Sequence, residues 1–275
     1  MSATAGDIDR AAIARADMVE AQGWAAMFPV APPALGLKVV RFGEATGLIA
    51  PALPLGMFNR VIGLGATREA GAEAIDEVVL TYRAAGASKV WIHTTPVTAP
   101  ALEPMLVAKD FRAAQPNSWA KLAYPEERPL PTPPTALTVD KAGAADADDL
   151  GAVLIAAHGM PPALKSWVMA MVGHPAWRAY AARDGGRVVA GAFLHAESDG
   201  GWLGLGGTLP DARNRGAHSA LLARRVADAR AAGARTIVSE TWEPEPGGRN
   251  PSLDNMKRLG FRVLYSRANW ELPLA

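Results

Sequence analysis

Apolar positions recur at helical spacing in some segments of the chain and alternate with polar positions in others. The first pattern predicts helices and the second predicts strands. In the first half they predict, in order, a helix over 8–28, strands over 37–42, 45–49 and 59–67, a helix over 68–85, a strand over 90–94, a helix over 101–108 and a strand over 118–123.

The second half has its own series of elements around one glycine-rich central strand. The predicted order is a strand over 136–139, helices over 145–157 and 162–171, strands over 177–182 and 187–196, the central strand over 202–209, a helix from about 216 to 233, a strand over 236–241, a helix over 251–259 and a strand over 262–270. The turn Asp184-Gly185-Gly186 joins the second and third of these strands as a hairpin.

A proline-rich segment separates the two halves. Five prolines lie between Tyr124 and Thr135, and proline cannot donate the backbone hydrogen bonds of a helix or a sheet. We therefore expect a stiff, extended linker over 125–135, with one domain over 1–124 before it and a second domain over 136–275 after it.

The two halves also match each other as an internal repeat. Val61–Thr67 parallels Trp202–Thr208 at an offset of 202 − 61 = 141, and Arg83–Ala87 is identical to Arg230–Ala234 at 230 − 83 = 147. Phe111 parallels Phe261 at 150. The rise from 141 to 147 predicts that the first copy lacks six residues between its central strand and its helix. In the second copy those residues form a basic loop, so we expect the first copy to hold no anion there.

That basic loop reads Arg213-Asn214-Arg215-Gly216-Ala217-His218. Small residues let a ligand approach the backbone, and the first N–H groups of a helix have no partner within it, so those from about Gly216 to Ser219 are free to bind an anion. Arginine forks suit phosphate oxygens. The pattern predicts a pyrophosphate site, and the alternative is an ordinary strand, turn and helix with a solvated basic turn.

The motif Arg213-x-x-Gly216-x-His218 resembles motif A of the GNAT acyl-CoA transferase superfamily, (Arg or Gln)-x-x-Gly-x-(Gly or Ala), except that a histidine stands at the last small position. The element order after 135 is similar to that of the GNAT fold, and the first half resembles a degenerate copy. The resemblance implies an α+β fold with an α/β mixed sheet in two tandem GNAT-like acyl-CoA N-acyltransferase domains, with acetyl-CoA as cosubstrate.

The resemblance also implies which residues bind this cosubstrate. Backbone groups of the central strand would pair with the pantetheine arm, the loop and the first helical turn would hold the pyrophosphate, and two asparagines near the last helix complete the expected set: Leu205, Gly206, Gly207, Thr208, Arg213, Asn214, Arg215, Gly216, Ala217, His218, Ser219, Asn250 and Asn255.

Catalytic roles are assigned less directly. The tyrosine that acts as general acid in many GNAT members falls on Met256, and a thioether donates no proton. Tyr265 and Ser252 are nearby in sequence and are the candidate replacements. Glu240, on the strand after the cofactor helix, is the candidate base. The alternative for Glu240 is a solvated or ion-paired residue at the end of a strand.

Composition narrows the function classes. The chain has 28 basic and 27 acidic side chains, scattered through both halves, and no cysteine, so we expect neither a nucleic-acid partner, a disulfide nor a thiolate metal site. The histidines lack metal-ligand spacing, so we expect no metal. No apolar run reaches membrane-spanning length and no secretory signal is visible, so we expect a cytoplasmic protein without a membrane partner, as a monomer or a homodimer.

Together these features predict an N-acetyltransferase that moves an acetyl group from acetyl-CoA to a primary amine of a small molecule or peptide, by direct attack in a ternary complex. A non-catalytic acyl-CoA-binding or sensing protein is the alternative, because the tyrosine is absent. A protein that binds some other phosphate ligand is a third interpretation.

Overall fold

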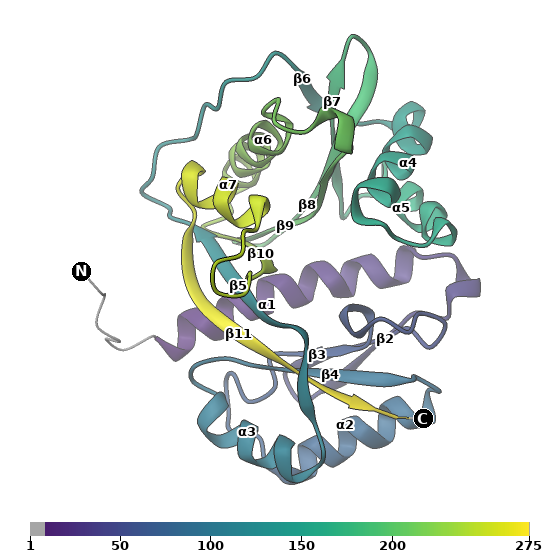
Figure 1. Cartoon of the computed structure of the whole chain (residues 1–275), viewed down its shortest axis with the longest axis vertical. Helices are drawn as coiled ribbons and strands as arrows, with labels where there is room; N and C mark the ends of the chain where they lie inside the picture. The colour runs from purple at the N-terminus through teal and green to yellow at the C-terminus, as the bar shows by residue number, and fades with distance from the viewer. Residues whose placement is uncertain (1–8, 275) are drawn as a thin grey trace. The chain divides into compact units, whose positions relative to one another are not determined.

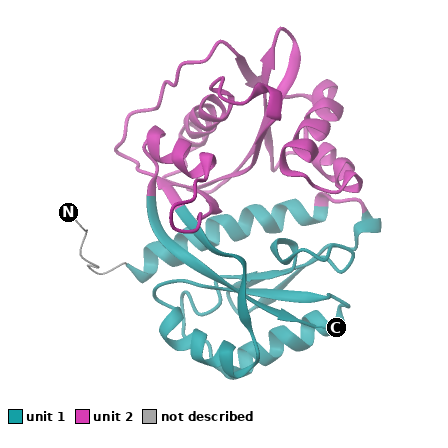
Figure 2. Cartoon of the chain, in the orientation of Figure 1, with its two compact units in different colours: residues 1–29, 33–121, 263–275 teal, residues 30–32, 122–262 magenta. Residues whose placement is uncertain are grey.

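The structure is a computed structural model that describes residues 9–274. The chain forms two compact units, shown in different colours in Figure 2. Unit 1 holds the N-terminal helix up to Pro29, residues 33–121 and the chain from Val263 onward, whereas unit 2 holds residues 30–32 and 122–262. The boundaries expected from the proline-rich linker place the last strand in the C-terminal domain, and in the structure most of that strand packs with unit 1.

Unit 1 contains three helices and six strands in the described part of the chain. They are α1 (Arg10–Met27), β1 (Lys38–Phe42), β2 (Ala45–Ile49), β3 (Arg60–Ile62), α2 (Ala72–Ala84), β4 (Lys89–Thr94), α3 (Ala99–Ala108), β5 (Arg112–Tyr124) and β11 (Arg262–Pro273). Their order in the sheet is β1-β2-β3-β4-β11-β5, with β3 and β4 parallel and β4 and β11 antiparallel (Figure 1).

Helices α2 and α3 cover one face of this sheet. The buried residues of α2 are Ile75, Val78, Val79 and Tyr82, which recur at helical spacing and pack against Val90 and Ile92 of β4. The Tyr82 hydroxyl lies 2.8 Å from the carbonyl oxygens of both Leu48 and Arg60, so its single proton is shared between two acceptors and this buried polar atom is satisfied. The apolar core of unit 1 therefore lies between these two helices and the sheet.

A fully buried ionic cluster joins α1 to strands from distant parts of the sequence. Glu20 of α1 forms ion pairs with Arg60 of β3, Lys121 of β5 and Arg267 of β11, and all four side chains are 0% exposed. Burial alone would raise the pKa of Glu20, but Arg267, Lys121 and Arg60 together hold it well below its usual range. Because a buried carboxylate without these partners would be costly, the cluster helps to fix β11 in unit 1.

Unit 2 contains the remaining elements. They are β6 (Thr138–Lys141), α4 (Ala147–His158), α5 (Lys165–Met171), β7 (Arg178–Asp184), β8 (Arg187–Glu197), β9 (Gly200–Thr208), α6 (Ala217–Ala231), β10 (Thr236–Trp242) and α7 (Pro251–Leu259). The strand order is β10-β9-β8-β7-β6, with β10 parallel to β9 and the other neighbours antiparallel.

Glycines let the helices of unit 2 lie close to both faces of this sheet. A Cβ on Gly191 of β8 would lie 2.2 Å from Leu150 of α4, and a Cβ on Gly201 of β9 would lie 3.1 Å from Ala229 of α6. Figure 1 shows α4 and α5 on one side of the strands and α6 and α7 on the other. No helix in residues 9–274 is long and apolar enough to cross a bilayer.

The structure corrects the prediction for the first central strand. The expected strand over 59–67 ends at Ile62, and the expected helix over 68–85 begins only at Ala72. Nine residues, 63–71, connect β3 to α2, and eight residues, 209–216, connect β9 to α6. The connection in the first copy is therefore not shorter, contrary to the prediction, and the two copies differ instead in the lengths of the strand and the helix. The start predicted at Ile8 for the first helix lies outside the described residues, and α1 begins at Arg10.

Candidate functional site

The two central strands of unit 2 separate along their length. Strands β9 and β10 pair only from Gly200 to Trp202 and from Thr236 to Val238. Just beyond, the Ser239 hydroxyl donates to the Leu203 carbonyl at 2.9 Å. From residue 204 to 208 the β10 side of strand β9 has no ladder partner in the described chain, so its backbone groups are available to an extended ligand.

A bulge interrupts the ladder on the other side of β9. The register with β8 shifts between Gly191 and Phe193, so that Leu205 and Gly206 oppose one residue, and Leu205 has a φ of 45°. Buried Arg225 of α6 donates to the carbonyls of Phe193 and Gly204 at 3.1 Å each. Burial lowers the pKa of Arg225 to about 9. The guanidinium thus links helix α6 to both strands at the bulge.

Helix α6 begins with unpaired backbone donors. Its N-cap residue is Gly216, with a φ of 84°, and no side chain caps the helix. The first intrahelical backbone bond is donated by Ala220 to the Gly216 carbonyl, so the amides from Ala217 to Ser219 remain unpaired within the described chain. A Cβ on Gly216 would lie 2.6 Å from the Pro134 carbonyl oxygen. Both the backbone angle and the close approach therefore require glycine here.

A cleft of about 1190 Å³ lies between strand β9, with its bulge, and the start of helix α6. This volume exceeds the range of about 300–1,000 Å³ that is usual for small-molecule pockets, so the cleft suits a long ligand. It is lined by Pro133, Pro134, Thr135, Ala136, Ala157, His158, Gly206, Gly207, Thr208, Ala212, Arg213, Asn214, Arg215, Gly216, Ala217, His218, Ser219, Trp242, Asn250, Pro251, Ser252, Asn255 and Arg258.

Three arginines contribute positive charge to the lining of the cleft. Arg213 is exposed and its guanidinium has no partner among the described residues. Arg215 forms an ion pair of 2.6 Å with Asp184, and Arg258 donates to the Asn255 side-chain oxygen. Beside the unpaired amides of α6, Arg213 is the cation best placed to bind an anionic ligand.

Hydrogen bonds hold the start of α7 against the cleft. The Asn250 side-chain oxygen accepts from the Ser252 amide at 2.9 Å, and its amide nitrogen donates to Thr241 at 2.9 Å and to the Trp242 carbonyl at 2.6 Å. The Asn255 amide lies 3.2 Å from Nδ1 of His218. Twelve of the thirteen residues predicted to bind the cosubstrate thus line one cleft, and the exception, Leu205, lies in the bulge beside it.

The three predicted catalytic residues are placed differently. Ser252 lines the cleft. Glu240 lies on β10, where the Trp202 indole donates to its two carboxylate oxygens at 3.0 and 3.1 Å, and it is not among the lining residues. Tyr265 is buried in unit 1, where its hydroxyl donates to Asp17. Because that hydroxyl is already engaged in unit 1, we leave Tyr265 out of the catalytic group.

Sequence reasoning missed part of the wall of the cleft. Residues 133–136 come from the segment expected to act only as a linker and its continuation, and the Thr135 hydroxyl donates to the Arg215 carbonyl at 2.9 Å. Ala157 and His158 come from the end of α4. Proline content marked the first segment as extended, but nothing in its sequence indicated that it lies against the loop.

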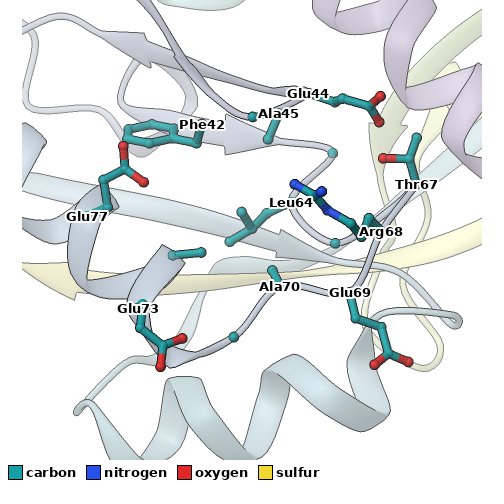
Figure 3. A pocket seen from close by; sticks show the side chains of 15 residues that line it. Phe42, Glu44, Ala45, Leu64, Thr67, Arg68, Glu69, Ala70, Glu73 and Glu77 are labelled. Carbon is teal, nitrogen blue, oxygen red and sulfur yellow. The ribbon is translucent and has the colours of Figure 1, made fainter.

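Unit 1 has a smaller cleft of about 590 Å³ beside β3 and α2, at the place that the repeat relates to the cleft of unit 2. Figure 3 shows its lining side chains, which include Arg68 and the four carboxylates of Glu44, Glu69, Glu73 and Glu77. Four negative charges against one positive charge disfavour a diphosphate.

The separated strands and bare helix end are the arrangement implied by the sequence resemblance, and comparison with known families supports it. Residues 133–239 match the sequence profile of the acetyltransferase (GNAT) domain. Within unit 2, residues 133–239 are therefore similar to a GNAT acetyltransferase domain. No curated protein matches the chain.

Solved GNAT structures share the fold of the whole chain. A GCN5-related N-acetyltransferase from Kribbella flavida superposes with a TM-score of 0.66 at 19% identity, covering 95% of each chain. A tandem GNAT protein from the clavulanic acid biosynthesis pathway superposes with a TM-score of 0.63 at 14% identity, covering 93% of this chain and 87% of that one. A GCN5-related N-acetyltransferase from Sphaerobacter thermophilus superposes with a TM-score of 0.61 at 16% identity, covering 84% of this chain and 80% of that one.

These likenesses show a mixed α/β fold whose size fits tandem GNAT-like domains. The GNAT family transfers acyl groups from acyl-CoA to amines, so its members need a site for a long, anionic thioester. The described residues of unit 2 fit such a ligand, since an open strand edge, unpaired helix amides and an unpartnered arginine line one cleft. No group of three or more acidic or histidine side chains that could hold a metal occurs within residues 9–274.

Proposed function

We propose that this chain transfers an acetyl group from acetyl-CoA to a primary amine of a small molecule or peptide, by direct attack of the amine. One observation carries the proposal: strands β9 and β10 separate in front of an uncapped helix whose first residue, Gly216, has the positive φ that a closely approached loop requires. That geometry suits a diphosphate joined to an extended arm.

Each part of the cleft then has a binding role. The amides of Ala217 to Ser219 would hold the pyrophosphate, with Arg213 adding a charge-assisted hydrogen bond. The open edge of β9 from Gly206 to Thr208 would pair with the pantetheine amides. A Cβ on Gly207 would meet Ala157 at 2.8 Å, so the strand lies close to α4 at this point.

Glu240 is the proposed base. An amine must be neutral to attack a thioester, so a carboxylate must take up its proton directly or through water. The Trp202 indole holds this carboxylate in one orientation on β10. Backbone N–H groups at the bulge, where the ladder is interrupted at Leu205 and Gly206, would stabilise the developing oxyanion.

A non-catalytic acyl-CoA-binding protein is the second candidate, and one observation favours it. The residue at the position of the family's general-acid tyrosine is Met256, which is 1% exposed and cannot donate a proton. Such a protein would bind acetyl-CoA in the same cleft and signal through the bound state.

Release of CoA from acetyl-CoA in the presence of a panel of primary amines separates the two candidates. An acetyltransferase gives amine-dependent, saturable release that falls at least tenfold in Glu240→Gln with little change in acetyl-CoA binding. The matched control is Glu243→Gln, which alters a carboxylate three residues away in the loop after β10. Saturable acetyl-CoA binding without release on any amine would instead support the binding protein.

A further inference from the structure

A short chain of hydrogen bonds fixes the proton on the His218 ring. The Arg258 guanidinium donates to the Asn255 side-chain oxygen, so the Asn255 amide nitrogen faces Nδ1 of His218, 3.2 Å away. A side-chain amide nitrogen only donates, so Nδ1 must accept and carry no proton. The proton of the neutral ring is therefore on Nε2. The opposite orientation of Asn255 would set its two donors against those of Arg258.

The same ring stays neutral under ordinary conditions. Burial, together with the nearby positive charge of Arg225 and the imidazole of His158, lowers the pKa of His218 to about 4. The charged or titratable groups that face the ring are thus Arg225 from its own helix, the imidazole of His158 from α4, and Arg258 through Asn255. His218 consequently presents a permanent N–H donor and neither a base nor a cation.

The Nε2 side of the ring lies beside strand β9 in the wall of the cleft. His218 lines the cleft together with Gly206, and the ring atom Cδ2, which is bonded to Nε2, lies 3.8 Å from where a Cβ on Gly206 would stand. No residue in the described chain accepts a hydrogen bond from Nε2. If the diphosphate lies at the start of α6, the thioester end of the arm must lie deeper, toward the bulge and the point where β9 and β10 meet.

We propose that the Nε2–H group of His218 donates a hydrogen bond to the sulfur atom of the bound acyl-CoA. This inference rests on the function proposed above and gives the histidine a role different from phosphate contact. When the amine nitrogen bonds to the acyl carbon and the carbon–sulfur bond breaks, the electron pair passes to sulfur, and the donor stabilises the charge that develops there. The amine proton goes to Glu240 or to water, and His218 keeps its own proton.

This role accounts for the departure of the motif from the family pattern. A glycine or alanine at residue 218 would offer no side-chain donor, whereas the histidine supplies one in a chain that has Met256 where the family has its tyrosine. A thiolate is already a fair leaving group, so a neutral hydrogen-bond donor is enough to assist its departure without full proton transfer.

Nitrogen-15 NMR of the histidine side chains tests the inference in the full-length protein without knowledge of the acceptor. Long-range ¹H–¹⁵N spectra report which ring nitrogen carries the proton, and the His218 signals are assigned from their absence in His218→Phe. The probes are acetyl-CoA, CoA and desulfo-CoA, which lacks only the sulfur. Backbone amides of residues 216–219 report binding of the diphosphate independently.

The expected result is an Nε2–H tautomer whose Nε2 resonance moves with acetyl-CoA and CoA but not with desulfo-CoA, although all three probes move the amides of 216–219. An Nδ1–H tautomer, or an equal response to desulfo-CoA, would overturn the inference and leave the proposed function standing. If none of the three probes shifted those amides, the result would contradict both the proposed function and this role of His218.

Kinetic variants supply a second readout once an amine acceptor is in hand. Loss of a hydrogen bond to a developing charge lowers kcat by roughly tenfold in His218→Phe with little change in KM for acetyl-CoA. His218→Gln, whose side-chain amide can present an N–H in a similar place, should recover part of that loss. Equal kcat values for the wild type and His218→Phe would contradict the role.

Discussion

Gly216 combines two constraints at one residue. Its φ of 84° is unfavourable for a residue with a Cβ, and that Cβ would lie 2.6 Å from the Pro134 carbonyl oxygen. Gly247 has a similar φ of 82° in an open loop, with nothing within 4 Å of its added Cβ. Alanine substitutions at Gly216 and Gly247 would therefore cause similar backbone strain, but only the substitution at Gly216 would also cause a steric clash.

Gly216→Ala should abolish the rise in melting temperature that acetyl-CoA produces, because the loop must shift to relieve the contact with Pro134. In Gly247→Ala the strain of about 1 kcal/mol or more lowers the melting temperature without removing the acetyl-CoA effect. Thermal melts with and without ligand measure both variants. An undiminished ligand effect in Gly216→Ala would show that this loop does not hold the diphosphate.

The lowered pKa of His218 also predicts how stability depends on pH. Its folded pKa of about 4 lies below the unfolded value of about 6.5. As the pH falls from about 6.5 toward 4, the unfolded chain takes up a proton that the folded chain excludes, so the free energy of unfolding decreases. Urea unfolding between pH 4 and 7 should therefore show a shallower decline in His218→Phe. Parallel curves for the two proteins would contradict the lowered pKa.

Local sequence was sufficient to predict most of the cleft and insufficient for Tyr265. The loop from Arg213 to Ser219 and the N-cap Asn250 follow from rules that act over a few residues, such as exposed helix amides and capping. Tyr265 depends on which strand β11 pairs with, and its register with β4 is set by residues more than 170 positions away. Nearness in sequence to Met256 therefore could not indicate this pairing or the hydrogen bond from Tyr265 to Asp17.

At the scale of elements, the proline-rich segment over 125–135 also makes specific hydrogen bonds with the loop before α6 and with α6 itself. The Thr135 hydroxyl donates to the Arg215 carbonyl, and Arg230 of α6 donates to the carbonyls of Pro125 and Glu126. A Cβ on Gly260 at the end of α7 would clash with Arg128. The segment is thus tied to α6 and α7 and forms part of the wall beside the anion loop.

Thr135→Val removes the hydroxyl that holds the loop and keeps the shape of the side chain. A net hydrogen bond contributes about 1 kcal/mol, so the melting temperature without ligand should fall by roughly 2–4 °C. Acetyl-CoA affinity should fall by up to roughly fivefold, because the loop is no longer held in its binding conformation. Thr132→Val, an exposed residue of the same segment, is the matched control. Titration calorimetry measures both affinities, and equal values would mean that the segment does not support the loop.

The internal repeat did not predict the boundary of the first central strand correctly. Matching sequences predicted that the first copy lacks six residues of the loop between its central strand and its helix, but the connections in the structure are 63–71 and 209–216 and are nearly equal in length. The apolar pattern continues from Val61 through Leu64, so a strand was predicted to run on. In the structure Gly63 and Gly65 have φ values of 83° and 75°, and the strand ends before them. Glycine conformation, which pattern alone does not specify, decided the boundary.

At the scale of the whole chain, β11 makes the N-terminal unit dependent on the C-terminal residues. From Ala268 to Pro273 this strand pairs with β4, and its Arg267 completes the buried cluster around Glu20. The proline-rich linker predicted one boundary between an N-terminal and a C-terminal domain. The pairing of β11 with β4 joins residues far apart in the sequence, and composition does not reveal such a pairing.

Expression of 136–275 alone should therefore give a poorly soluble product, because β11 would expose unpaired backbone groups and the buried side chains of Arg267 and Asn269. Co-expression with 1–135 should restore a soluble complex of the two pieces. Size-exclusion chromatography distinguishes the outcomes. A stable, monomeric 136–275 fragment would show that β11 does not need unit 1.

Titration calorimetry of the full-length chain with acetyl-CoA tests the central claim most directly. The account predicts saturable binding at one site per chain that weakens as salt increases and is lost in Arg213→Ala combined with Gly216→Ala, but is kept in Arg187→Ala, which alters an exposed arginine outside the cleft. Absence of heat with acetyl-CoA, or two equivalent sites that survive the double substitution, would contradict it.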